Sequence, residues 1–219
     1  MHVGRKVMSN MYLSYYAVIF AGINTDINTF EHPSAEIISQ LKQSVPSSVV
    51  RTKTIYPYDA AISGDTFSDT FQVVKNAYDL CGNTVGSMAE EIINDYQGEE
   101  CVFFVGYSGG GIAATKTAEK LLKMNFKPLL RIIRVGSPVL TVGKQLYGRT
   151  VDLVLHGDPV TQLEIPRFIK NMRPYQCFIK NLRITGQVHS CYFRKDLTSD
   201  DGVSNLTKTT NKILNFVKN

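Results

Sequence analysis

The stretch CVFFVGYSGGG, residues 101–111, decides the fold of this chain. It begins with five apolar residues, 101–105, a run that predicts a buried β-strand. Apolar residues then recur at helical spacing from Ala114 to Leu122, with lysine and glutamate on the opposite face. The pattern Gly106-x-Ser108-x-Gly110 therefore lies at a sharp turn between a strand and a helix.

Such a turn has a defined chemical use. It raises the Ser108 hydroxyl above the carboxyl edge of a sheet, and Gly106 and Gly110 carry no Cβ that would clash across the turn. The amide of Gly109 lies at the helix start, where an unpaired N–H and the helix dipole can stabilise an oxyanion. The alternative interpretations are a plain glycine-rich turn and a phosphate cradle. The strand before the pattern, the helix after it and partners further along the chain favour a nucleophile elbow.

Strands and helices alternate along the rest of the chain. The apolar strands predict a mainly parallel sheet of about six strands covered by helices on both faces, which is an α/β fold. Ligands of such sheets bind beyond the carboxyl ends of the strands. The expected strands are residues 13–20, 49–56, 101–105, 131–135, 151–155 and 178–184, and the expected helices begin near residues 33, 65, 85, 110 and 203.

Length and composition set bounds on the class of protein. The chain has 219 residues, 43% hydrophobic and 20% charged, which predicts one soluble globular domain over residues 1–219. A net charge of +5 without a basic, aromatic-rich motif gives no reason to expect nucleic-acid binding. The four cysteines have no metal-ligand spacing, so we expect free thiols, no metal and a cytoplasmic location.

The apolar stretch at residues 11–23 superficially resembles a signal peptide, because Arg5 and Lys6 precede it. It is rich in tyrosine and β-branched residues, and no small-residue cleavage site follows. We interpret it as a buried strand. It is also too short to cross a membrane, which takes about 20 apolar residues.

A serine nucleophile needs a base that accepts its proton and an acid that orients the base. His189 follows the last expected strand, and Asp158 follows the strand before it. The order Ser108, Asp158, His189 is that of the α/β-hydrolases. Taken singly, a loop histidine is usually structural and an aspartate before proline usually begins a turn. His156 is the alternative base, but it lies two residues from Asp158 and should point into the same loop.

Five short motifs follow one another along the chain. They are Phe20-Ala-Gly-Ile23, the elbow, Val135-Gly-Ser-Pro138, Asp158-Pro-Val-x-x-Leu-x-x-Pro166 and His189-x-x-Tyr192. In this order they resemble the motifs of class 3 lipases, the fungal-lipase-like branch of the α/β-hydrolases. The second family that they resemble is the cutinases, which rely on disulfides that this cysteine spacing does not obviously supply.

The resemblance implies two-step acyl transfer on a small-molecule or lipid ester, with no cofactor. Ser108 would be the nucleophile, His189 the base and Asp158 the orienting acid. The backbone N–H groups of Gly109 and Ile23 would form the oxyanion hole. Ile23 stands where the family has threonine, so only its backbone could contribute.

Other functions use the same residues. A thioesterase or acyltransferase would need the same triad, and a non-catalytic binding protein could keep the fold. A nucleotide-binding protein is disfavoured because residues 136–144 do not match the phosphate-loop pattern. The sequence gives no oligomeric state.

Two segments allow a plain and a specific interpretation. Residues 65–82 would form either a lid over the site or a helix that covers the sheet. Residues 165–195 hold seven Lys or Arg and no acidic residue. They form either a solvated face or a surface that attracts an anionic substrate or membrane.

Overall fold

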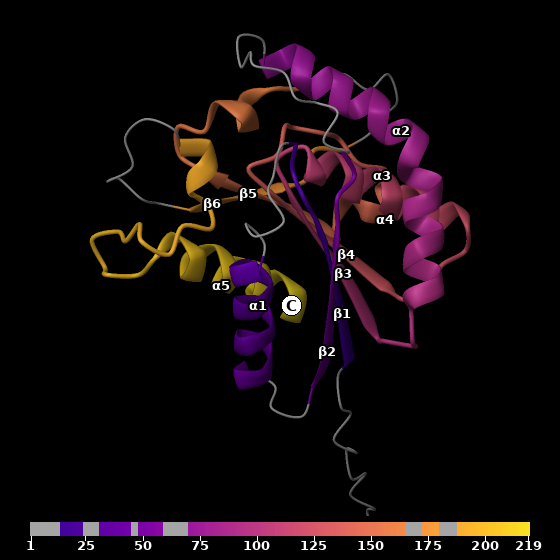
Figure 1. Ribbon diagram of the computed structural model, residues 1–219, viewed down its shortest axis with the longest axis horizontal. Coiled ribbons are helices and arrows are strands. Elements are labelled where there is room, and N and C mark those ends of the chain that lie inside the picture. The colour runs from indigo at the N-terminus through magenta and orange to yellow at the C-terminus, as the bar shows by residue number, and fades with distance from the viewer. Residues whose placement is uncertain (1–13, 24–30, 45–47, 59–69, 165–171, 180–187) are drawn as a thin grey trace, which may run out of the picture.

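Six parallel strands form one sheet in the order β2-β1-β3-β4-β5-β6. A computed structural model of the chain describes residues 14–23, 31–44, 48–58, 70–164, 172–179 and 188–219. The predicted α/β fold class, a mainly parallel sheet of about six strands with helices on both faces, is confirmed by this topology (Figure 1). The strands are β1 (Ser14–Phe20), β2 (Val49–Ile55), β3 (Cys101–Tyr107), β4 (Leu129–Val135), β5 (Thr150–Leu155) and β6 (Tyr175–Ile179).

Strands β1 and β3 are almost entirely apolar because both of their faces are buried. Along β1, Tyr15, Ala17 and Ile19 point to one face, and the residues between them point to the other. β3 repeats the pattern beside it, and each face of the sheet carries its own hydrophobic core. Each fully buried Ile, Val or Phe contributes roughly 1.5–3 kcal/mol, so these strands hold the sheet together.

Helices cover both faces (Figure 1). α1 (Glu31–Ser44) and α5 (Asn205–Lys218) bury Leu41, Ile213 and neighbouring apolar residues against one face. α2 (Thr70–Asp95) and α3 (Gly110–Lys123) pack together over the other face, where Ile92 and Leu121 join the core. A short α4 (Lys144–Tyr147) precedes β5 and buries Leu146.

Two helices were expected over residues 65–96, and this expectation is wrong for the part of the segment that the structure describes. A single helix, α2, runs through Gly82 and Gly86. The apolar stripes on the two sides of the glycines are in phase, since Cys81 and Val85 are four residues apart. A mid-helix glycine costs about 1 kcal/mol, which the packing of the stripe on the core outweighs. Residues 65–69 lie outside the described residues, so the lid interpretation stays a prediction.

The last strand also differs from the sequence prediction. β6 begins at Tyr175 rather than Phe178, and the predicted residues 180–184 lie outside the described residues. Tyr175 pairs in register with Val151 of β5 but is 75% exposed. β6 is an edge strand with few buried side chains, so apolar composition does not mark where it starts.

Over residues 14–23, the described part of the apolar stretch 11–23, the interpretation as a buried strand agrees with the structure, in which β1 (Ser14–Phe20) lies between β2 and β3. Among the helices that the structure describes, none is both long and apolar enough to span a bilayer. None of the four cysteines forms a disulfide. Burial raises the pKa of the Cys81 and Cys101 thiols to about 11, so both stay protonated and behave as small apolar residues.

Candidate active site

The turn after β3 has the strained geometry that the sequence predicts. Ser108 has a φ of 52°, a left-handed conformation that non-glycine residues rarely adopt. The backbone on both sides leaves no room for side chains. A Cβ on Gly106 would lie 2.5 Å from the Gly110 carbonyl oxygen, and one on Gly110 would lie 2.2 Å from the carbonyl oxygen of Phe20. The Ser108 N–H donates to the Val135 carbonyl at 2.9 Å, which fastens the turn to β4.

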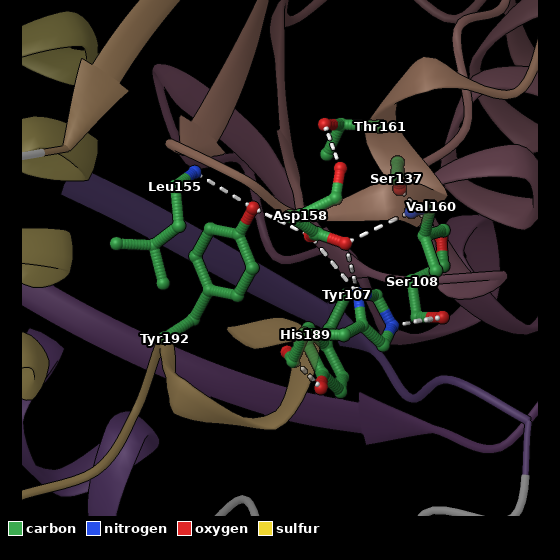
Figure 2. Close-up of polar contacts among 9 residues, drawn as sticks. All are labelled: Tyr107, Ser108, Ser137, Leu155, Asp158, Val160, Thr161, His189 and Tyr192. Atoms are coloured by element: carbon green, nitrogen blue, oxygen red, sulfur yellow. Dashed lines mark hydrogen bonds and ion pairs between the residues drawn. The ribbon is translucent and has the colours of Figure 1, made fainter. Parts of the chain in front are cut away.

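The structure brings the three predicted side chains together at the carboxyl edge of the sheet (Figure 2). His189 Nε2 lies 2.9 Å from Ser108 Oγ, and its Nδ1 lies 3.0 and 3.1 Å from the two carboxylate oxygens of Asp158. Ser108 follows β3, Asp158 follows β5, and His189 belongs to the short 3-10 helix η4 (Val188–Cys191). An unbroken row of hydrogen-bonding groups therefore joins the hydroxyl to a buried carboxylate.

His156, the alternative base, has a different environment. It is exposed just after β5, whereas His189 is the histidine within hydrogen-bonding distance of Ser108. The reason is the strand order. His189 reaches the serine because η4 lies beside Asp158, just beyond the end of β5.

Asp158 also begins a turn, as the alternative interpretation of this residue predicts. Its carboxylate accepts the Val160 N–H at 2.9 Å and caps the 3-10 helix η3 (Pro159–Gln162). Its own carbonyl accepts the Thr161 hydroxyl at 2.8 Å. The aspartate is only 1% exposed, and the turn fixes its backbone while the side chain faces His189.

Two tyrosines support this arrangement, and both lie inside motifs that the sequence had singled out. The Tyr192 hydroxyl donates to Asp158 Oδ2 at 2.8 Å and accepts the Leu155 N–H at the same distance. Burial and the nearby carboxylate raise the pKa of Tyr192, so its hydroxyl keeps the proton that it donates. The Tyr107 ring stacks on His189 at 5.4 Å, and its hydroxyl donates to the His189 carbonyl.

The two residues predicted to supply the oxyanion donors lie against each other. A Cβ on Gly109 would be 3.1 Å from Ile23 Cγ1, so the loop after β1 packs directly on the elbow. Within the described part of the chain, the Gly109 N–H has no backbone acceptor, as expected at a helix start. Sequence reasoning missed Tyr58, which is buried beside Ile23 and donates to the Gly109 carbonyl at 2.8 Å. No motif pointed to it, because it follows an edge strand.

The basic segment is less available than its composition suggests. Two of its described arginines are paired, Arg173 with Glu164 and Arg194 with Asp196, and all four side chains are at least half exposed. Exposed pairs contribute little stability, but they cancel charge locally. These pairs favour the solvated-face interpretation. Four of the seven basic residues, 167, 170, 180 and 183, lie outside the described residues.

The described part of the chain holds no group of three or more His, Cys, Asp or Glu side chains that could bind a metal. The buried polar groups at this edge of the sheet instead satisfy one another by hydrogen bonds. What they offer chemically is a hydroxyl beside an imidazole that is itself backed by a carboxylate.

Comparison with known proteins gives no family assignment. No protein-family model matches the chain, and no curated protein does either. Among solved structures, a Trichoderma reesei cutinase in complex with a C11Y4 phosphonate inhibitor is similar, with 15% identity and a TM-score of 0.48. The similarity covers 93% of this chain and 74% of the cutinase chain.

Two structures of RedJ are also similar. One is the RedJ thioesterase from the prodiginine biosynthetic pathway in Streptomyces coelicolor, with 14% identity, a TM-score of 0.34 and coverage of 61% of this chain and 42% of that one. The other, RedJ with a PEG molecule bound in the active site, has 12% identity, a TM-score of 0.40 and coverage of 68% and 71%. Likeness at this level carries no argument about activity. The resemblance to class 3 lipases stays a prediction, and a cutinase is the second family that the motifs resemble.

Proposed function

We propose that this protein is a serine hydrolase that cleaves a carboxylic ester through an acyl-enzyme intermediate. One observation carries the proposal, the continuous contact from Ser108 Oγ through His189 to the buried carboxylate of Asp158. A structural histidine in a loop has no need of a strained serine on one side and a buried acid on the other. Strain of this kind clusters at functional sites.

In the first step, Ser108 Oγ attacks the ester carbonyl while His189 Nε2 accepts the hydroxyl proton. Asp158 holds Nδ1 protonated and stabilises the imidazolium that forms. When the tetrahedral intermediate collapses, the C–O bond to the alcohol breaks, and the imidazolium gives its proton to the leaving oxygen. Water then attacks the acyl-enzyme by the same route, which releases the acid and restores the serine.

The negative charge of each tetrahedral intermediate needs donors on the opposite side of the reacting carbon from the imidazole. The Gly109 N–H and the Ile23 N–H are the groups that we assign to this role. They come from the helix start after β3 and from the loop after β1, which contact each other. Each such donor contributes about 3–4 kcal/mol of transition-state stabilisation.

The nucleophile assignment is tested with an organophosphonate probe and a p-nitrophenyl ester. Wild-type protein should be labelled covalently and should turn over the ester. Ser108→Ala should not be labelled, and its kcat should fall by about six orders of magnitude, to background. His189→Ala should lose turnover as well, while the matched His156→Ala variant should keep it. Labelling of Ser108→Ala equal to the wild type would refute the nucleophile, and loss of turnover in His156→Ala alone would refute the base.

The substrate class is a second measurement on the same protein. We infer a small-molecule or lipid ester, in line with the family resemblance. Rates for oxygen esters and thioesters of matched acyl length distinguish an esterase from a thioesterase, and added alcohol or amine acceptors reveal acyl transfer. Saturable binding of an ester with no turnover and no probe labelling would instead identify a non-catalytic binding protein on this fold.

A further inference from the structure

The Gly136-Ser137-Pro138 turn after β4 has no part in the triad, yet it lies directly against the elbow. The Ser137 side chain is buried, and its hydroxyl donates to the carbonyl oxygen of Ser108 at 2.5 Å (Figure 2). The same carbonyl also accepts the Gly111 N–H at 3.1 Å. The Ser108 carbonyl is therefore held by a side chain from the turn that follows the neighbouring strand, β4.

That carbonyl belongs to the peptide unit whose N–H is the proposed oxyanion donor. A peptide unit is planar and trans, so the C=O of Ser108 and the N–H of Gly109 point in opposite directions from one rigid plane. A hydroxyl that fixes the oxygen therefore fixes the direction of the N–H. A hydrogen bond accepted by a carbonyl also polarises the amide, which makes the attached N–H a better donor.

The residues around the Ser137 hydroxyl leave room for its hydrogen bond to Ser108. A Cβ on Gly111 would lie 1.9 Å from Ser137 Oγ, so the helix start leaves room for this hydroxyl only because residue 111 is glycine. The next peptide unit is held separately, because Tyr58 donates to the Gly109 carbonyl. Side-chain hydroxyls from two different loops thus fix two successive peptides at the elbow.

We propose that Ser137 is a positioning residue that aims the Gly109 N–H at the developing oxyanion. This inference rests on the proposed ester hydrolysis. A misaimed donor affects the tetrahedral intermediate and leaves the ground-state ester and the triad alone. Its signature is a fall in kcat without a change in KM or in the pH dependence of the triad.

The experiment compares Ser137→Ala with wild-type protein on a p-nitrophenyl ester and on the phosphonate, which forms a tetrahedral adduct. Loss of a whole oxyanion donor lowers kcat by about 10²–10³-fold. Ser137→Ala keeps the Gly109 N–H but removes the hydrogen bond that orients its peptide plane. The kcat and the phosphonate reaction rate should therefore both fall about tenfold. KM and the acid limb of the kcat/KM profile should not move. Ser137→Thr, which keeps the hydroxyl, should retain the wild-type kcat.

The matched control is Thr115→Val on α3. The Thr115 hydroxyl is buried and donates to the Gly111 carbonyl at 2.8 Å, but this peptide carries no oxyanion donor. Its kcat should equal that of the wild type. If Ser137→Ala does not fold, Ser137→Cys decides the question, because a thiol is a weak donor and its kcat should fall as well.

The outcomes separate this inference from the proposed function. A wild-type kcat in folded Ser137→Ala or Ser137→Cys overturns the role of Ser137 and leaves the hydrolase in place. A raised KM with an unchanged kcat overturns it too, because the serine would then shape ground-state binding. If wild-type protein neither turns over esters nor reacts with the phosphonate, the hydrolase proposal fails and this inference fails with it.

Discussion

Two buried aspartates, one within β5 and one just after it, have chemically different partners. Asp152 lies within β5, and Asp158 lies three residues after it ends. Asp152 is 5% exposed and Asp158 is 1% exposed. Arg134 meets the first carboxylate with two hydrogen bonds, at 2.5 and 2.7 Å. The second carboxylate meets the His189 ring, a tyrosine hydroxyl and a backbone N–H.

The two aspartates differ in how far their negative charge is neutralised. Arginine is always protonated, so the charge of Asp152 is permanently neutralised by a bidentate partner on the adjacent strand. Asp158 has donors but no permanent cation among its described contacts. Its charge is therefore balanced fully only when His189 carries a second proton, which is the state that a general base reaches during catalysis.

Burial of an acid is thus no guide to function by itself. A neutralised buried acid fixes strand register, as at Arg134 and Asp152, which face each other across β4 and β5. A buried acid with only dipolar partners keeps a negative charge that can stabilise a neighbouring imidazolium. Three predictions test this contrast, and the largest effect comes first.

Asp158→Asn should have the largest effect on turnover. The amide keeps the shape of the side chain but loses the charge, and it favours the wrong tautomer of His189. The kcat should fall about 10⁴-fold, as in other triads. Steady-state kinetics on the p-nitrophenyl ester measure it, with thermal unfolding as the check on folding. If kcat falls less than tenfold in the folded variant, His189 is oriented by something else and the contrast between the two acids breaks.

Arg134→Met should have its effect on stability. It leaves the Asp152 charge buried without a cation, which typically costs about 3–5 kcal/mol of unfolding free energy. Urea unfolding measures the loss, and the folded fraction should keep its kcat. Arg134→Met combined with Asp152→Leu should recover much of that loss, because removal of both charges leaves none unpaired. A double variant less stable than Arg134→Met would contradict this account, and so would a lost kcat at unchanged stability.

Tyr192→Phe should have the smallest effect of the three and should sharpen the contrast. It removes one donor from Asp158 and leaves the carboxylate, its charge and the ring volume in place. A hydrogen bond to a charged group is worth about 1.5–3 kcal/mol, so kcat should fall about tenfold. With one donor fewer, the carboxylate is held less firmly against the His189 ring, and steady-state kinetics on the p-nitrophenyl ester measure the loss.

A kcat of Tyr192→Phe equal to that of the wild type would reduce Tyr192 to a packing role. The matched control is Tyr15→Phe, another largely buried tyrosine on the same face of the sheet, well away from the triad in sequence and structure. Its kcat should be that of the wild type.

Much of the candidate site could be predicted from the chain. Ser108, Asp158 and His189 are polar residues at strand ends in a known order, and strand ends of a parallel sheet meet at one edge. The support around them could be predicted only in part. Tyr107, Ser137 and Tyr192 stood out as motif members, but their hydrogen-bond partners lie 29 to 82 residues away. Local spacing carries no information about such distances.

The sequence predictions were wrong where one local pattern is compatible with two structures. The glycines at 82 and 86 are helix breakers by propensity, and only the packing of one stripe against the core shows that α2 continues through them. The start of β6 was misplaced because an edge strand leaves its apolar side chains exposed. The paired state of Arg173 and Arg194 was not visible in a segment chosen for its lack of acids, because both partners lie just outside it.

Hydrophobic pattern and turn chemistry by themselves determined the alternation of elements, the parallel sheet and the elbow at Ser108, because these depend on neighbours along the chain. Tertiary structure alone decided which buried acid faces an arginine and which faces a histidine. That choice depends on which strands lie side by side, and two carboxylates six residues apart on one segment are separated chemically only by the side chains that the fold brings to them.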